Sequence, residues 1–136
     1  MKKHGMKLFA AAVVLLGAAS WAGEHNNMTV SVDLVGRIAA GDLGTARNTT
    51  NTKEFIGCTI QSSLTVTSVQ CRAGDATGTQ GYCNTTNPAM VETARAINGD
   101  DRLAFLWDAN NNCTLISLEK FSAYPPKNHD LSKAAP

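Results

Sequence analysis

The clearest pattern of apolar and polar positions lies in residues 102–119, where two apolar runs flank three consecutive asparagines. Apolar runs separated by turn-forming residues are typical of a β-hairpin. A turn centred on Asn110 and Asn111 is favoured because asparagine tolerates the positive φ angles of tight turns. The expected cross-strand pairs are Trp107 with Thr114, Phe105 with Ile116, and Leu103 with Leu118. The other face is also mostly apolar, so we expect this hairpin to be covered on both sides.

A half-buried strand is predicted for residues 28–36, in which Val30, Val32 and Leu34 alternate with polar residues. Residues 37–52 carry only scattered apolar side chains and are expected to form a loop, with one helical turn near residues 42–47.

A second hairpin is predicted from residues 54–60 and 64–71, joined by a turn at residues 61–63. If Ile60 lies opposite Leu64, the apolar side chains of both runs share one face. Cys58 then points into the core, where a partner from the first hairpin could meet it.

One helix is indicated after Asn87, a favourable N-cap residue that is followed by Pro88 at the first helical position. Its apolar stripe comprises Met90, Val91, Ala94 and Ile97. Gly99 follows the last turn, where a left-handed stop is expected. Together these elements predict an α+β fold, a small antiparallel β-sheet domain of five or six strands with one helix packed on it.

The first 22 residues have the pattern of a secretory signal peptide. A lysine-rich start precedes an apolar run at residues 8–19, and small residues lead to a cleavage site after Ala22. A membrane anchor is the alternative, but the run is short for spanning a bilayer. The expected organisation is a signal peptide at residues 1–22, one domain at residues 23–124 and a flexible tail at residues 125–136.

Charge argues against nucleic acid as a partner. The leader holds three of the twelve basic residues, which leaves nine against eleven acidic ones in the exported part. No basic stripe is present that would attract phosphate backbones. We expect the partner to be a protein or an envelope glycan. We also expect the cleaved protein to be a monomer that makes no contact with the membrane.

Four cysteines follow the leader, and an even number in an exported chain predicts two disulfides. They are Cys58, Cys71, Cys83 and Cys113. Sequence leaves three pairings open, of which we favour Cys71–Cys83 with Cys58–Cys113. Each bridge is expected to stabilise the domain by about 3–4 kcal/mol. A zinc site is the alternative, but neither CxxC spacing nor a histidine near any cysteine supports it.

Catalytic chemistry has few candidates in this sequence. The histidines after the leader, His25 and His129, lie near the ends of the exported chain, which disfavours a Ser–His or Cys–His pair. A carboxylate-dependent hydrolase would use Glu92, Asp100 and Asp101. Asp108 could not join them, because it lies about 20 Å away along one strand at about 3.3 Å per residue.

One spacing is compatible with calcium, although we expect no metal and no cofactor. Asp108, Asn110, Asn112 and Glu119 fall at positions one, three, five and twelve of an EF-hand loop. Position six is Cys113 rather than glycine, and the flanking segments are strand-like. The asparagines are therefore interpreted as turn formers.

A glycine-rich connection at residues 72–82 is the predicted recognition loop, since loops on rigid scaffolds commonly carry binding residues. The candidate residues are Arg72, Asp75, Thr77, Gln80, Tyr82 and Asn84. The expected function is a secreted or periplasmic non-enzymatic module that binds another macromolecule or has a structural role. The alternatives are the carboxylate-dependent hydrolase and an inhibitor of an extracellular enzyme.

The chain also resembles a group of small exported bacterial proteins that share an IGC strand, a cysteine-tied hairpin, a TxPAM helix start and a WD-to-C hairpin. The residues that carry this resemblance are Ile56, Gly57, Cys58, Cys71, Cys83, Thr86, Pro88, Ala89, Met90, Trp107, Asp108 and Cys113. The motifs are structural, and the resemblance implies no activity, ligand or catalytic residue.

Overall fold

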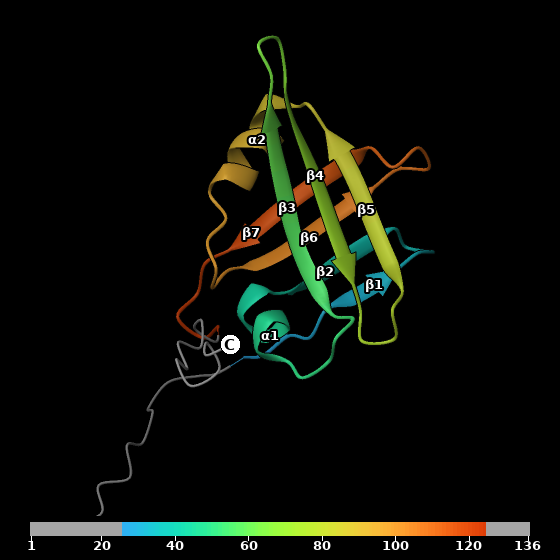
Figure 1. Ribbon diagram of the computed structural model, residues 1–136, viewed down its shortest axis with the longest axis vertical. Coiled ribbons are helices and arrows are strands. Elements are labelled where there is room, and N and C mark those ends of the chain that lie inside the picture. Colours follow the sequence, from blue (N-terminus) through green and yellow to red (C-terminus); the bar gives the residue numbers. More distant parts are fainter. Residues whose placement is uncertain (1–25, 125–136) are drawn as a thin grey trace, which may run out of the picture.

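The computed structural model describes residues 26–124, which fold into two antiparallel β-sheets packed face to face with two helices (Figure 1). The four-stranded sheet has the order β1-β2-β6-β7 and the three-stranded sheet the order β3-β4-β5. The strands are β1 Ser31–Asp33, β2 Ile38–Asp42, β3 Phe55–Ser62, β4 Thr67–Gly74, β5 Gln80–Thr85, β6 Arg102–Trp107 and β7 Cys113–Glu119; the helices are α1 Leu43–Asn48 and α2 Pro88–Arg95. The α+β prediction is confirmed, with seven strands in place of five or six and with a second helix.

The core lies between the two sheets. Leu103 and Phe105 are fully buried, and the rings of Phe105 and Trp107 pack with their centroids 5.7 Å apart. Gly81 on β5 makes room for Trp107, because a Cβ at this glycine would lie 2.6 Å from the indole ring. Glycine on one sheet therefore accommodates the large indole side chain of the other.

The β6–β7 hairpin forms almost as its sequence predicts. Phe105 pairs with Ile116 and Leu103 with Leu118, and Asn111 has a positive φ of 60° in the turn. A β-bulge between Leu106 and Trp107 shifts the last pair, so that Trp107 lies opposite Cys113 and not Thr114.

The expected cover on both faces of this hairpin is wrong. Its outer face belongs to the exposed side of the four-stranded sheet, where Leu115 is 43% exposed and Leu106 half-buried. In register with them, Ile38 of β2 is also exposed. The only layer that covers the hairpin within residues 26–124 is therefore on its inner side.

Strand β2 lies within a segment that the sequence predicts as a loop. Its small residues give no alternation signal, yet Ala39 is buried opposite Phe105 of β6. Gly41 is required there, because a Cβ would lie 2.9 Å from the Cα of Val30. Helix α1 follows directly and confirms the predicted helical turn, whereas Leu34 of the predicted first strand lies exposed in the turn after β1.

The β3–β4 hairpin has a longer turn than predicted. Ser63 closes it by donating its N–H to the carbonyl of Val66 at 2.8 Å, while its hydroxyl accepts from the Val66 N–H at 3.1 Å. Ile60 therefore lies opposite Val69, not Leu64, and Leu64 is fully exposed at the tip of the hairpin.

Helix α2 begins as predicted, with the side chain of Asn87 accepting the N–H of Ala89 at 2.9 Å. Val91 and Ala94 are buried on its inner face. The predicted stop at Gly99 is wrong, because the helix ends at Arg95 and Gly99 does not adopt a positive φ.

The disulfides join Cys58 to Cys71 and Cys83 to Cys113, so the favoured pairing is wrong. The longer turn places Cys58 directly opposite Cys71 on β4, with their Cα atoms 4.0 Å apart. Cys71 also lies opposite Cys83 on β5, but Cys83 bonds across to the other sheet. That bond is possible because the Asn84 N–H donates to the Asn111 carbonyl at 2.9 Å, which brings the start of β7 beside β5.

The predicted signal peptide, the predicted tail and both candidate histidines, His25 and His129, lie outside the described residues. Within residues 26–124, neither helix is long and apolar enough to cross a bilayer. The two disulfides indicate an oxidising compartment, extracellular or periplasmic.

Candidate binding surface

The exposed face of the three-stranded sheet brings together four of the six predicted loop residues. Successive residues of a strand point to opposite faces, so alternate positions of β3, β4 and β5 form this surface. Its members are Phe55, Gly57, Thr59, Gln70, Arg72, Gln80, Tyr82 and Asn84. We call it the sheet B face; Figure 1 shows the three strands in front, with no helix lying over them.

A hollow of about 260 Å³ opens on this face at Gly57, beside Phe55 and Arg72. A Cβ built on Gly57 would meet no atom within 4 Å, so the missing side chain leaves open space in mid-strand. The guanidinium carbon of Arg72 lies 5.9 Å from the centroid of the Phe55 ring. Phe55 packs closely against Gly74, where a Cβ would lie 2.6 Å from the ring.

The polar groups of the sheet B face are only partly engaged. Gln70 donates its side-chain N–H to Asn84 at 3.0 Å, and Asn111 donates to the Tyr82 hydroxyl at 3.2 Å. Tyr82 remains 45% exposed. The Arg72 guanidinium has no hydrogen bond or ion pair within residues 26–124, so a charged donor group is available beside the hollow.

Asp75 and Thr77 do not belong to this face. They lie in the tight turn between β4 and β5, where the Asp75 carboxylate accepts the N–H groups of Thr77, Gly78 and Thr79 at 2.9–3.0 Å. The Thr77 hydroxyl also donates to this carboxylate at 2.7 Å and is the main reason that the pKa of Asp75 is lowered. Most of the predicted recognition loop is therefore β-strand. In the remaining turn, the Asp75 carboxylate is hydrogen-bonded to neighbouring residues of the same turn.

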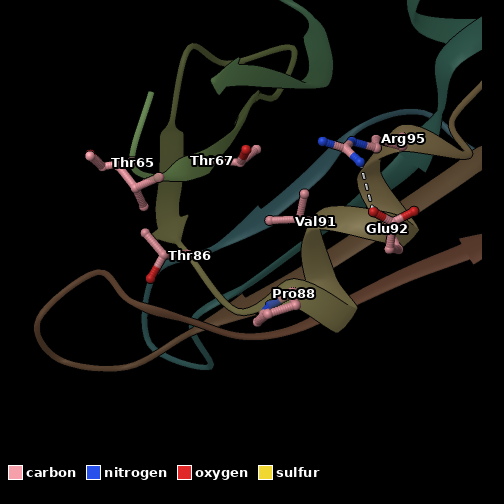
Figure 2. A pocket seen from close by; sticks show the side chains of 8 residues that line it. Thr65, Thr67, Thr86, Pro88, Val91, Glu92 and Arg95 are labelled. Atoms are coloured by element: carbon pink, nitrogen blue, oxygen red, sulfur yellow. Dashed lines mark hydrogen bonds and ion pairs between the residues drawn. The ribbon is translucent and has the colours of Figure 1, made fainter. Parts of the chain in front are cut away.

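A groove of about 360 Å³ lies between the tip of the β3–β4 hairpin and helix α2 (Figure 2). Thr65 and Thr67 line one side, and Val91 and Glu92 the other. Glu92 is paired with Arg95 at 2.8 Å, with both side chains exposed. Among the described residues that line the groove, Glu92 is the sole carboxylate.

The carboxylates of the hydrolase hypothesis are not gathered in this groove. Asp101 is 2% exposed and accepts from the Asn98 N–H at 2.7 Å and the Lys120 ammonium at 2.8 Å. Asp100 lies exposed in the preceding turn. The acid–base pair that this mechanism requires is therefore not formed by Glu92 with either aspartate.

The residues at EF-hand spacing form the turn of the β6–β7 hairpin, where Asp108 accepts hydrogen bonds from the chain itself. The Asp108 carboxylate accepts the N–H groups of Asn110 and Asn112 at 2.8 and 2.9 Å, and the Asn112 side-chain amide at 3.0 Å. The Asn112 side chain contributes most to lowering the pKa of Asp108. Glu119 lies at the far end of β7, and no cluster of three acidic, histidine or cysteine ligands occurs in residues 26–124.

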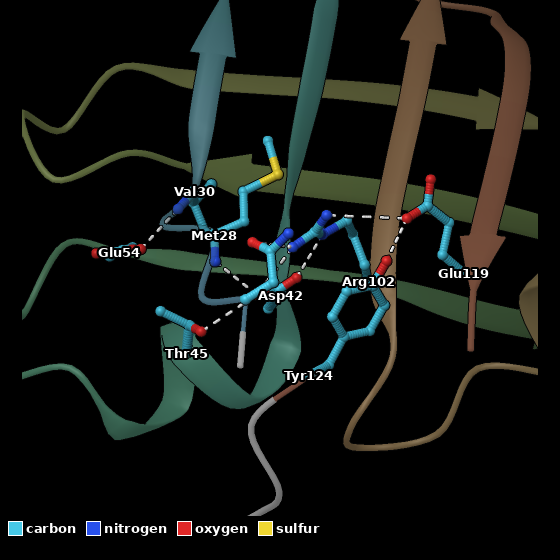
Figure 3. A network of polar contacts seen from close by, with 9 residues as sticks. Met28, Val30, Asp42, Thr45, Glu54, Arg102, Glu119 and Tyr124 are labelled. Atoms are coloured by element: carbon cyan, nitrogen blue, oxygen red, sulfur yellow. Dashed lines mark hydrogen bonds and ion pairs between the residues drawn. The ribbon is translucent and has the colours of Figure 1, made fainter. Parts of the chain in front are cut away.

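A buried polar network that no sequence pattern indicates lies at the end of the four-stranded sheet opposite the turn at residues 108–112 (Figure 3). Asp42, Arg102 and Glu119 lie in one cross-strand row. Asp42 has no exposed surface and accepts from Arg102 Nε at 2.6 Å and from the Met28 N–H at 2.6 Å. The hydrogen bond that Arg102 donates to Asp42 raises the pKa of Arg102. No local signal reveals this row, because it depends on β2 pairing with β6.

The same network holds both ends of the described chain. Tyr124 lies over the Arg102 guanidinium, 4.3 Å from its ring centroid, and donates its hydroxyl to Glu119. Burial raises the pKa of Tyr124. Asn26 donates its backbone N–H to the Ala123 carbonyl at 2.9 Å. These contacts are structural, since every polar group in them is paired within the chain.

The chain matches no known protein-family model, no curated protein and no solved structure. The resemblance to exported bacterial proteins therefore rests on the sequence motifs alone, and the functional argument rests on the geometry of the described surfaces.

Proposed function

We propose that this protein is a non-enzymatic secreted or periplasmic module that binds another macromolecule, a protein or an envelope glycan, through the sheet B face. The hollow at Gly57 carries this proposal. A glycine in mid-strand normally weakens a sheet, and an isolated one often marks a place where another molecule approaches the backbone closely. Here no atom of residues 26–124 lies within 4 Å of a Cβ built on this glycine, and Phe55 and Arg72 border the open space.

The composition of the face supports recognition. Tyrosine and arginine are enriched at the energetic centres of protein interfaces, because both combine apolar contact with directed polar groups. Tyr82 and Arg72 lie directly opposite each other on β5 and β4. The disulfide joins Cys58 of β3 to Cys71 of β4, which are the strand neighbours of Gly57 and Arg72, and restrains the two strands beside the hollow.

The proposal is tested by filling the hollow with Gly57→Thr. A Cβ at this position meets no atom within 4 Å, and threonine suits an extended strand better than glycine, so stability is expected to stay equal or rise by up to about 1 kcal/mol. Capture of partners from envelope extract by the immobilised protein is expected to fall strongly with Gly57→Thr and with Tyr82→Ala.

Ser117→Thr is the matched control, since it adds a methyl group to the exposed side of the other sheet. It is expected to capture the same partners as the wild type. If Gly57→Thr and Tyr82→Ala also capture the same partners in the same amounts, the sheet B face is not the recognition surface.

Inhibition of an extracellular enzyme is the second candidate, and the β3–β4 hairpin tip favours it. Leu64 is fully exposed in a turn closed by the hydrogen bonds of Ser63. Figure 1 shows the β3–β4 hairpin, which carries this turn, extending beyond the rest of the fold. A rigid loop with an apolar tip is suited to inserting into an enzyme cleft. Incubation with a panel of lysozymes and proteases tests this, with inhibition expected from the wild type and lost in Leu64→Ser; no inhibition by the wild type argues against this candidate.

A further inference from the structure

We infer that β3 offers its open edge to an extended, acidic peptide segment of the partner, which adds to the three-stranded sheet as a fourth strand. This inference rests on the proposed function and names the partner that the sheet B face would hold. Edge strands present unpaired N–H and C=O groups, and an added strand satisfies them while pockets beside the edge select its side chains.

The direction of the free backbone groups follows from the disulfide pair. Directly opposite residues in antiparallel strands are about 5.5 Å apart at Cα when they exchange hydrogen bonds and about 4.5 Å when they do not. The 4.0 Å between Cys58 and Cys71 therefore marks a non-hydrogen-bonded pair. The N–H and C=O groups of Cys58, and by alternation those of Ile56 and Ile60, point away from β4 toward the open edge.

β3 is the longest edge strand within residues 26–124, and helices α1 and α2 contact it toward its two ends. It has eight residues, contains neither proline nor lysine, and its backbone pairs with β4 alone. The other edge strands are shorter: β1 has three residues, β5 has six and is joined to the β6–β7 turn through Asn84, and β7 has seven and packs beside α2. In Figure 1 the middle of β3 lies between α1 at one end and α2 at the other.

Two hollows lie beside this edge on opposite faces of the strand. The hollow at Gly57 opens on the sheet B face and also reaches the backbone of Ile56 and Cys58. The second, of about 180 Å³, lies on the inner side, where Leu43 and Ala46 of α1 face Ile56. Successive side chains of an added strand alternate between the same two faces, so neighbouring ligand residues would enter the two hollows in turn.

Charge defines the chemistry of the added strand. Arg72 borders the outer hollow and forms no hydrogen bond or ion pair within residues 26–124. Arg47 borders the inner hollow, but its guanidinium already donates to the Gly99 carbonyl at 3.0 Å. The single carboxylate in either lining is Glu54, which is 8% exposed and already accepts the Val30 N–H at 2.7 Å. We therefore assign an acidic ligand side chain to the outer hollow, beside Arg72, and an apolar one to the inner hollow, against Leu43 and Ala46.

The probe is a capped peptide of four Val-Glu repeats, titrated into ¹⁵N-labelled protein. The amide signals of Ile56, Cys58 and Ile60 are expected to shift and to gain protection from exchange. Those of Gly57 and Thr59, which already bond to β4, are expected to change less. A Val-Lys peptide is expected to bind at least tenfold more weakly, and Arg72→Gln to weaken the Val-Glu peptide about twofold to fivefold.

Backbone pairing is tested with two N-methylated forms of the same peptide. One is methylated on every valine amide and the other on every glutamate amide, so each blocks the donors along one edge of the ligand strand. One form is expected to lose binding and the other to keep it, and the identity of the active form gives the strand direction. Equal binding of both forms overturns the inference.

Ile60→Pro removes a donor that faces the open edge without removing a bond to β4, a position where a strand tolerates proline. Ile60→Thr keeps that N–H and is the matched control. Peptide affinity is expected to fall at least tenfold in Ile60→Pro and little in Ile60→Thr, with similar melting temperatures. If Ile60→Pro does not fold, the two methylated peptides decide the question.

Failure of this inference is distinguishable from failure of the proposed function. If the peptide shifts no β3 amide while envelope extract or glycan fragments shift Arg72 and Tyr82, the strand inference falls and the binding face stands. If none of these additions perturbs either set of signals, both are wrong. Concentration-dependent dimerisation that protects the β3 amides without peptide would also overturn the inference, because the edge would then belong to a second copy.

Discussion

Asp42 organises a region of the chain in which the sequence alone predicts little structure. It has no exposed surface, and its carboxylate accepts from Arg102, from the Met28 N–H and from Thr45. A buried carboxylate is costly unless such partners satisfy it, and removing one member of a buried pair leaves the other uncompensated.

Asp42→Asn is therefore expected to lower the free energy of unfolding by about 3 kcal/mol, because the Arg102 guanidinium loses its charge partner while remaining largely buried. Urea denaturation measures this. Glu92→Gln, which breaks the exposed pair with Arg95, is the control and is expected to cost about 0.5 kcal/mol or less. Equal effects of the two substitutions would contradict the structural role given to Asp42.

The aspartates of the two turns, Asp75 and Asp108, are expected to titrate below the usual value for an aspartate. Hydrogen bonds from Thr77 and Asn112 respectively contribute most to lowering each pKa in the folded state. A lowered folded-state pKa means that their stabilisation is complete above the unfolded value of about 3.9 and is lost as pH falls through the folded value.

The measurement is an NMR titration of the two carboxyl carbons between neutral and strongly acidic pH. Both midpoints are expected below the unfolded value of about 3.9. In Asp108→Asn, the stability curve is expected to fall less steeply on the acid side than in the wild type. Midpoints at or above the ordinary value would show that the turn hydrogen bonds are not maintained in solution.

Elements formed by local chemistry were predictable here, and elements formed by distant pairing were not. The β6–β7 hairpin and the start of α2 follow from turn and cap residues, Asn111 and Asn87, that act within a few positions of themselves. β2 could not be predicted, because its small residues become a strand only through pairing with β6. The candidate face was half predicted: Arg72 and Tyr82 were identified, but Phe55 and Gly57 join them only through the register of β3 with β4.

The disulfide pairing depended on the same register. The turn lies at residues 63–66 and not at 61–63, and this register places Cys58 opposite Cys71. The parallel contact of Asn84 with Asn112 then leaves Cys83 beside Cys113. Peptide mapping of the purified protein without reduction is expected to recover Cys58 linked to Cys71 and Cys83 linked to Cys113.

The two bonds are expected to contribute unequally. Replacing Cys83 and Cys113 by alanine opens a closure of sequence separation 30 and is expected to cost about 4 kcal/mol, against about 3 kcal/mol for Cys58 and Cys71 with separation 13. Thermal unfolding of the two double variants measures the order. A larger loss from removing Cys58 and Cys71 would contradict this loop-length argument.

At the scale of the whole molecule, the buried ionic network and the proposed binding surface lie on different sheets. The four-stranded sheet carries the buried ionic network and both ends of the described chain, and its Cys113 bonds it to β5. The three-stranded sheet contributes few charged side chains to the interior and exposes Arg72, Tyr82 and the hollow at Gly57. An oxidising compartment permits this arrangement, because the disulfides replace part of the core that a small domain lacks.

The recognition role of the sheet B face is tested most directly by hydroxyl-radical footprinting in the presence and absence of envelope extract. Phe55 and Tyr82 are expected to lose reactivity when extract is added, while exposed Leu115 and Phe121 on other surfaces keep theirs. Unchanged reactivity at Phe55 and Tyr82, or protection of Leu115 in their place, would contradict the account.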